Sequence, residues 1–83
     1  MKTAYTNLYE ITELQQKIMR FIDYWVHVEK EPIPQKDIIS EMEAKGENKS
    51  SIIYSLNGLL KLGYIRRAVI ISNKTFYVML RRL

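Results

Sequence analysis

The residues of this sequence best suited to chemistry are polar and basic side chains between positions 49 and 61. They are two lysines, two serines, a tyrosine and an asparagine: Lys49, Ser50, Ser51, Tyr54, Asn57 and Lys61. Hydroxyl groups donate and accept hydrogen bonds, and a carboxamide pairs with adenine through two bonds. Lysine ammonium groups bind phosphates and position a protein without reading base sequence. The segment is therefore predicted to contact base edges through its hydroxyl and amide groups and phosphates through its lysines.

Three further basic residues follow this segment: Arg66, Arg67 and Lys74. They lie in a stretch rich in β-branched and aromatic residues, from which they could contact flanking DNA backbone or a minor groove. With about five or six phosphate contacts in total, affinity would fall with salt at a log–log slope of roughly −5.

Each of these residues also has a purely structural interpretation. The two serines are suited to support a helix cap, and Tyr54 could cover the preceding turn as partial core. The two lysines equally fit an ordinary solvated face. Arg81 and Arg82 follow an apolar strand, and we interpret them as residues that solubilise the C-terminal end.

The polar side chains at 49–61 require a helix that presents them on one side. Asn48 is a good N-cap and Gly63 supplies a left-handed end, so a helix is predicted from Asn48 to Gly63. Gly58 inside it is a mild penalty, which either permits close approach of another backbone or is a tolerated defect. The apolar positions of this helix are Ile52, Leu56, Leu59, Leu60 and Leu62.

Two more helices are predicted before it. Thr12 and Gln15 fit a capping box, which indicates a helix from about Thr12 to Val28. Pro32-Ile33-Pro34 forces extended backbone. The second helix is predicted to open at Pro34 and to stop at Gly46. The apolar positions of the two helices are Ile11, Leu14, Ile18, Phe21, Ile22, Trp25 and Val28, then Ile38, Ile39 and Met42.

The C-terminal part predicts a β-hairpin, with strands over 64–71 and 75–80 and a turn at 72–74. Alternate residues of a strand face opposite sides, so the apolar residues on both sides of 76–80 are a surplus. The surplus predicts either a homodimer surface, as in proteins that read palindromes, or a hairpin packed on the first helix with one face half exposed. The sequence leaves both open.

Composition restricts the class of protein. Eighty-three residues predict one domain over 1–83, with 1–10 as an N-terminal arm. The absence of cysteine excludes disulfides and thiolate sites. No stretch fits a signal peptide or a membrane span, so we expect a cytoplasmic protein without a membrane partner. Residues 1–44 carry five Lys/Arg against eight Asp/Glu, whereas 45–83 carry eight against Glu47 alone, as expected where one face meets a polyanion.

The sequence offers little for catalysis. His27 is the only histidine, so a metal site or a histidine relay has almost no ligands, and a hydrogen-bonded surface histidine is favoured. The acidic pairs Glu29/Glu31 and Glu41/Glu43 are interpreted as solvated faces, and no glycine-rich phosphate loop is present. We therefore predict that the protein is not an enzyme and uses no cofactor, metal or small-molecule substrate.

The order of these elements resembles the winged helix-turn-helix, a mainly α, α+β fold of three helices and a C-terminal β-hairpin wing. Three segments carry a closer resemblance: Ile11-Thr-Glu-Leu-Gln-Gln-Lys-Ile18, Pro32-Ile-Pro-Gln-Lys-Asp-Ile38 and Leu56-Asn-Gly-Leu-Leu-Lys-Leu-Gly-Tyr-Ile65. They resemble the DNA-binding domain of the LexA repressor, and the last of them is also similar to MarR-like regulators. Pro34 replaces the usual threonine cap of the second helix, and the surface residues of the third helix differ from those of LexA.

The resemblance implies sequence-specific binding of double-stranded DNA by a small transcriptional regulator. The third helix would enter the major groove and the wing would contact flanking backbone. The size is typical of viral or plasmid regulators, and a homodimeric repressor is the expected form. Two alternatives stay open: a winged helix that binds proteins, and a DNA-binding replication-initiation factor. Removal of Lys49 and Arg67 charges would abolish DNA retention under the first reading and leave partner binding intact under the protein-binding one.

Overall fold

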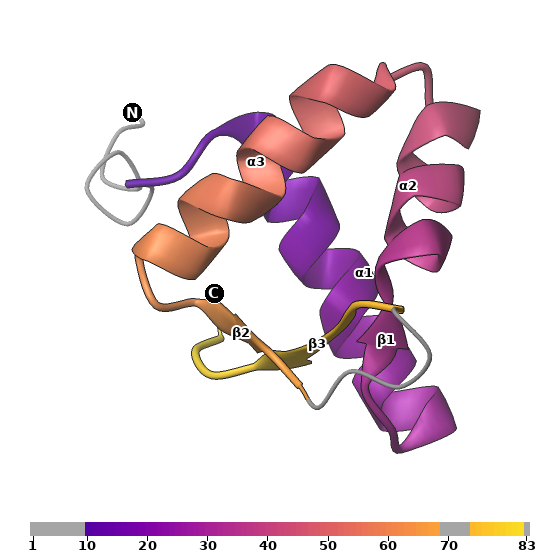
Figure 1. The fold of residues 1–83 in the computed structure, drawn as a ribbon, viewed down its shortest axis with the longest axis vertical. Coiled ribbons are helices and arrows are strands. Elements are labelled where there is room, and N and C mark those ends of the chain that lie inside the picture. Colours follow the sequence, from indigo (N-terminus) through magenta and orange to yellow (C-terminus); the bar gives the residue numbers. More distant parts are fainter. Residues whose placement is uncertain (1–9, 69–73, 83) are drawn as a thin grey trace, which may run out of the picture.

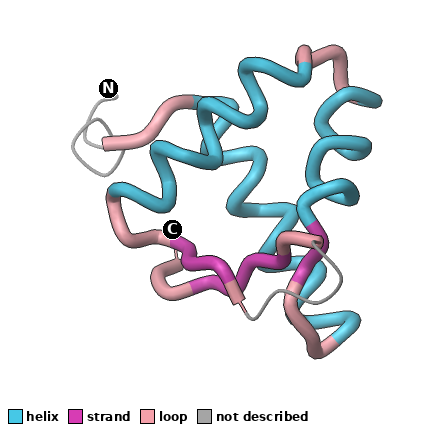
Figure 2. Tube along the Cα trace, in the orientation of Figure 1, coloured by secondary structure: helices cyan, strands magenta, loops and turns pink. Residues whose placement is uncertain are grey.

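The computed structural model describes residues 10–68 and 74–82. These residues form a mainly helical α+β fold, winged-helix-like as predicted, in which three helices pack beside a small antiparallel sheet (Figure 1; Figure 2). The expected N-terminal arm lies almost entirely outside the described residues, as do 69–71 of the first predicted hairpin strand. The elements are α1 (Glu13–Glu29), β1 (Ile33–Pro34), α2 (Gln35–Ala44), α3 (Lys49–Lys61), β2 (Ile65–Arg67) and β3 (Phe76–Met79).

The predicted capping box starts α1. The Thr12 hydroxyl accepts from the Gln15 backbone N–H at 3.1 Å, and the Gln15 carboxamide oxygen accepts from the Thr12 N–H at 2.8 Å. Two N–H groups that a helix start leaves unpaired are thereby satisfied. The helix ends at Lys30, which has a left-handed φ of 59°. The predicted bounds are thus correct to within one residue.

The turn between α2 and α3 is held by local hydrogen bonds at both ends. Gly46 has a φ of 95°, and the N–H groups of Gly46 and Glu47 donate back to the carbonyls of Glu43 and Met42. This pattern is a Schellman motif, in which glycine takes the left-handed position without a Cβ penalty. Asn48 then caps α3 by accepting from the Ser51 N–H at 2.8 Å. Gly46 as the end of α2 and Asn48 as the cap of α3 were both correctly predicted. Because the turn is hydrogen-bonded at both ends, α3 leaves α2 at a fixed angle.

The end of α3 repeats the motif at Gly63, whose φ is 81°. The N–H groups of Gly63 and Tyr64 donate to the carbonyls of Leu60 and Leu59 at 3.1 and 3.0 Å. Ile65 opens β2 immediately afterwards. α3 therefore passes into the sheet with no flexible linker between them.

The sheet has a third strand that the sequence did not predict. β3 lies between β1 and β2 and pairs antiparallel with each, and the Cα partner of Ile33 is Tyr77. The prolines do force extended backbone, as expected, but this backbone also pairs. Pro34 consequently serves as the last residue of β1 and the N-cap of α2, and α2 begins one residue later, at Gln35.

The apolar residues of 76–80 are accounted for by packing within the monomer. Tyr77 is buried, its neighbours from Phe76 to Met79 are partly buried, and only Leu80 is largely exposed, at 54%. β3 contacts α1, which is the second of the two expected arrangements.

The buried core lies between the three helices and the sheet, and it differs from the predicted set at a few positions. Val28 and Leu62, predicted apolar positions, are 54% and 41% exposed, Val28 in the last turn of α1 and Leu62 at the C-cap of α3. Met19 and Gln15 are buried instead. The core residues are Ile11, Ile18, Met19, Ile22, Ile33, Ile38, Met42, Ile52, Leu56, Leu59, Tyr64, Ile65 and Tyr77.

Candidate nucleic-acid interface

Four of the predicted contact residues form one exposed stripe along α3: Ser50, Tyr54, Asn57 and Lys61. Their spacing of three and four residues places them on the same side of a helix that turns by about 100° per residue. Tyr54 is 81% exposed, so it does not cover the preceding turn as partial core. The stripe combines hydroxyl, amide and ammonium groups on the side of α3 that faces away from the core.

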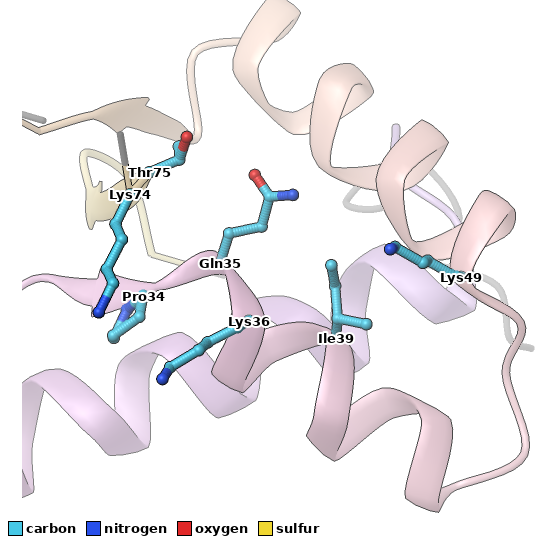
Figure 3. Close-up of a pocket in the computed structure, with 7 residues that line it drawn as sticks. All are labelled: Pro34, Gln35, Lys36, Ile39, Lys49, Lys74 and Thr75. Carbon is cyan, nitrogen blue, oxygen red and sulfur yellow. The ribbon is translucent and has the colours of Figure 1, made fainter. Parts of the chain in front are cut away.

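Lys49 and Ser51 lie on either side of this stripe rather than in it. Ser51 is half buried, and its backbone N–H is bound by the Asn48 cap. Lys49 is exposed at the first position of α3 and lies toward α2 (Figure 3). The six residues therefore share one helix but present three directions, with Ser51 the least available for contact with a ligand.

One polar contact in the core joins α1 to the middle of α3. The Gln15 carboxamide N–H donates to the Ser55 carbonyl at 3.2 Å. A Cβ built on Gly58 would lie only 2.5 Å from that same nitrogen atom. The neighbour of Gly58 is thus a side chain, so the predicted approach by another backbone is wrong, and a residue with a Cβ at this position would force the Gln15 carboxamide to move.

The predicted wing residues Arg66, Arg67 and Lys74 are all exposed. Arg67 pairs in register with Tyr77, whose hydroxyl donates to the Gln35 carboxamide oxygen at 3.0 Å. Burial raises the pKa of the Tyr77 phenol, and the nearby Arg67 guanidinium opposes that rise. The base of the wing is thus tied to the first residue of α2. The tip, 69–73, lies outside the described residues.

Arg81 has a structural role, contrary to the prediction that it only solubilises the C-terminal end. Its guanidinium lies 4.1 Å from the centre of the Tyr64 ring, a cation–π distance. It also donates to the Leu62 carbonyl at 3.4 Å and to the Glu10 carboxylate at 3.3 Å. Arg81 therefore binds the C-terminal end of α3, where a cation is favoured by the helix dipole.

Arg82 likewise contacts α1. Its guanidinium donates to His27 Nε2 at 3.0 Å and lies 3.6 Å from the Asp23 carboxylate. His27 Nδ1 is 2.8 Å from the Asp23 carbonyl. Because a guanidinium only donates, His27 accepts at Nε2 and donates from Nδ1. His27 is thus the hydrogen-bonded surface histidine that was predicted.

One basic residue escaped the sequence analysis: Lys36, in the first turn of α2. It lines a hollow of about 300 Å³ together with Lys49 and Lys74, between the starts of α2, α3 and β3 (Figure 3). The sequence did contain a signal for Lys36. A lysine at a helix start opposes the helix dipole, so its presence there indicates a role other than stabilising the helix. The complete lining is Pro34, Gln35, Lys36, Ile39, Lys49, Lys74 and Thr75.

Within 10–68 and 74–82, no three His, Cys, Asp or Glu side chains are grouped so that they could hold a metal ion. None of the helices there is both long and apolar enough to cross a bilayer.

No protein-family model and no curated protein sequence matches this chain. Among solved structures, the ferric uptake regulator of Francisella tularensis, determined with iron, is similar with a TM-score of 0.68 and 16% sequence identity. The match covers 86% of this chain and 53% of that protein, so this chain spans about half of the regulator's length. The resemblance to LexA and MarR-like proteins stays a prediction. What the structural likeness shows is the fold, that of a winged-helix-like domain.

Proposed function

We propose that this protein binds double-stranded DNA as a small transcriptional regulator, with α3 in the major groove and the hairpin wing on flanking backbone. A major groove accepts one α-helix, and the exposed stripe Ser50, Tyr54, Asn57 and Lys61 supplies groups for base edges and phosphates. The Schellman motif at Gly63 fixes the wing relative to that stripe. This rigid coupling of a polar helix face to exposed arginines is the observation that carries the proposal.

The distribution of charge supports a polyanionic partner. Lys61, Arg66, Arg67 and Lys74 are exposed in the half of the sequence that has an excess of seven positive charges. Among the ion pairs of the described residues, none engages these four side chains. Cations without local partners gain more from phosphates, because no intramolecular pair has to be broken.

The test is a salt titration of binding to random-sequence duplex DNA. The variant Lys61→Gln/Arg67→Gln is compared with Arg20→Gln/Lys45→Gln, which removes two charges from a separate hollow beside α1 and α2. We expect the wild-type affinity to fall at a log–log slope of roughly −5 and the first variant to reduce that slope by about 2. The control should keep the wild-type slope.

Equal losses in both double variants would show that only net charge matters, and absence of binding at low salt would refute the proposal. A specific site would next be sought by selection from random duplexes.

We propose further that the regulator acts as a homodimer, since one domain of this size reads one half-site. Tyr24 and Val28 lie one turn apart on α1 and are 61% and 54% exposed, so they offer two neighbouring apolar side chains for contact with a second copy. The same pair would serve the alternative function, a winged helix that binds another protein. Light scattering during the DNA titration separates these, because a dimer must give twice the monomer mass.

A further inference from the structure

We propose that the lysine-lined hollow between α2, α3 and β3 is a phosphate-binding pocket, and that it holds one backbone phosphate of the bound duplex. Lys36 belongs to this pocket and not to the contact residues proposed above, and Lys49 and Lys74 supply the other two positive charges. The inference deepens the proposed function, on which its DNA source rests. The shared chemistry is a phosphate group, and a free phosphorylated compound is the competing source that the experiment separates.

The three lysines reach the hollow from three different elements. Lys36 lies in the first turn of α2 and Lys49 at the first position of α3. Lys74 lies next to Thr75, just before β3 (Figure 3). The volume of about 300 Å³ equals that of roughly ten water molecules. The hollow therefore has room for a phosphate group together with part of its hydration shell.

The lining carries three positive charges and no carboxylate. Asp37 lies in the same turn of α2 as Lys36, yet it is not among the lining residues. Among the ion pairs of residues 10–68 and 74–82, none involves Lys36, Lys49 or Lys74. An anion in the hollow would meet cations that the described part of the protein leaves uncompensated.

Two of these lysines stand where folding alone disfavours them. A helix N-terminus carries partial positive charge, so a cation in its first turn is destabilising. Lys36 and Lys49 occupy the first turns of α2 and α3, and α2 begins without a side-chain cap, because Pro34 has no polar group to offer. α2 thus starts without a side-chain cap and with Lys36 in its first turn, whereas α3 is capped by Asn48 but still begins with Lys49. Both lysines line the same hollow. An anion bound beside either lysine would relieve the unfavourable placement of that lysine.

The position of the hollow fits a phosphate at the edge of a groove. Lys49 is next to Ser50, which begins the exposed stripe on α3, and it points toward Ile39 on α2 (Figure 3). A backbone phosphate beside a groove that contains α3 would approach from this side. The pocket would fix register on the duplex without reading bases, as phosphate contacts do.

Hydrogen bonds to β3 and to the residue before it also hold the pocket in shape. The Gln35 N–H donates to the Thr75 carbonyl at 2.8 Å, and the Gln35 carboxamide accepts from the Tyr77 hydroxyl at 3.0 Å. These bonds join the start of α2 to the backbone at β3, so the backbone positions that carry Lys36 and Lys74 stay close to each other. A binding site formed in advance loses less entropy when its ligand binds.

The test compares Lys36→Gln with Lys45→Gln, an identical change at an exposed lysine outside the hollow. Circular dichroism first confirms that both variants fold. We expect Lys36→Gln to weaken binding to random duplex DNA by about three- to tenfold at 0.1 M salt and to lower the salt slope by about 1. Lys45→Gln should do neither.

A second measurement uses inorganic phosphate and pyrophosphate with the free protein. In nuclear magnetic resonance titrations of the wild type, the amides of Gln35, Lys36 and Thr75 should shift at millimolar anion, and Lys36→Gln should abolish the shifts. If these shifts appear while both variants bind DNA alike, the pocket holds a free phosphorylated compound and the DNA source is overturned.

If the amides do not shift and the two variants bind DNA alike, the pocket proposal is wrong although the proposed function stands. If wild-type protein does not bind DNA at all, the proposed function is wrong, and the anion titration alone then supports or overturns the pocket.

Discussion

Gln15 makes a buried side-chain hydrogen bond that joins α1 to α3. Its carboxamide oxygen accepts from the Thr12 N–H, and its nitrogen donates to the Ser55 carbonyl. The side chain is only 8% exposed, so each bond is made in a region with little competing water. One amide therefore joins the start of α1 to the middle of the helix proposed to enter the groove.

This arrangement predicts that Gly58→Ala has opposite effects in two backgrounds. Alanine in a helix is normally worth about 0.5–1 kcal/mol over glycine. In the wild type the new Cβ displaces the Gln15 carboxamide, whose buried hydrogen bond is worth about 1–1.5 kcal/mol, so the free energy of unfolding should fall slightly. In a Gln15→Ala background the same change should raise it by about 1 kcal/mol. Urea unfolding of the four proteins gives the coupling, and an equal gain in both backgrounds would contradict the account.

At the scale of elements, α3 has a lysine at each end, and the two ends respond oppositely to charge. Lys49 opposes the helix dipole at the first position, whereas Lys61 in the last turn is favoured by it. Both are exposed, and both are predicted to bind phosphates. Stability and function therefore conflict at one end of α3 and agree at the other.

The expected outcome is that Lys49→Gln raises the free energy of unfolding by about 0.3–1 kcal/mol and Lys61→Gln lowers it by a similar amount. Both should weaken DNA binding and reduce the salt slope by about 1 each. Urea unfolding at low ionic strength and the DNA titration measure the two effects. If Lys49→Gln destabilised the protein, Lys49 would have a structural role that its exposure does not reveal.

At the scale of the whole molecule, two buried tyrosines connect the sheet with the helices. Burial is the main cause that raises the pKa of both the Tyr64 and Tyr77 phenols. A hydrogen bond with Glu10 raises the pKa of Tyr64 further, while Arg81 opposes the rise. The folded protein thus keeps both phenols protonated at a pH where the unfolded chain ionises them.

Stability should accordingly fall under alkaline conditions. Below about pH 9 both states hold the phenolic protons and the contribution is complete, whereas from about pH 10 upward the unfolded state releases protons first and is favoured. Tyr77→Phe should flatten this decline, at a cost of about 1 kcal/mol at neutral pH for the bond to Gln35. Urea unfolding from pH 8 to 11 measures both, and a decline parallel to that of the wild type would show that Tyr77 does not contribute.

The three helices follow from local sequence, because their boundaries are encoded in adjacent residues. Thr12 with Gln15, Asn48, Gly46 and Gly63 satisfy or terminate helical hydrogen bonds within a few positions of themselves. The exposed stripe on α3 follows from the same local geometry, since spacing alone places side chains around a helix. Its role in binding stays a prediction.

The features that local sequence does not predict are those formed by contacts between distant residues. β1 has two residues, too few to show a strand pattern, and it exists because Ile33 pairs with Tyr77, 44 positions away. The contacts of Arg81 with Leu62 and Glu10 likewise join residues that are distant in the sequence. The lysine-lined hollow needs both β3 and the fixed α2–α3 turn, because its three lysines come from separate segments of the chain. No local pattern encodes this arrangement, since residues from separate segments line one hollow only in the folded chain.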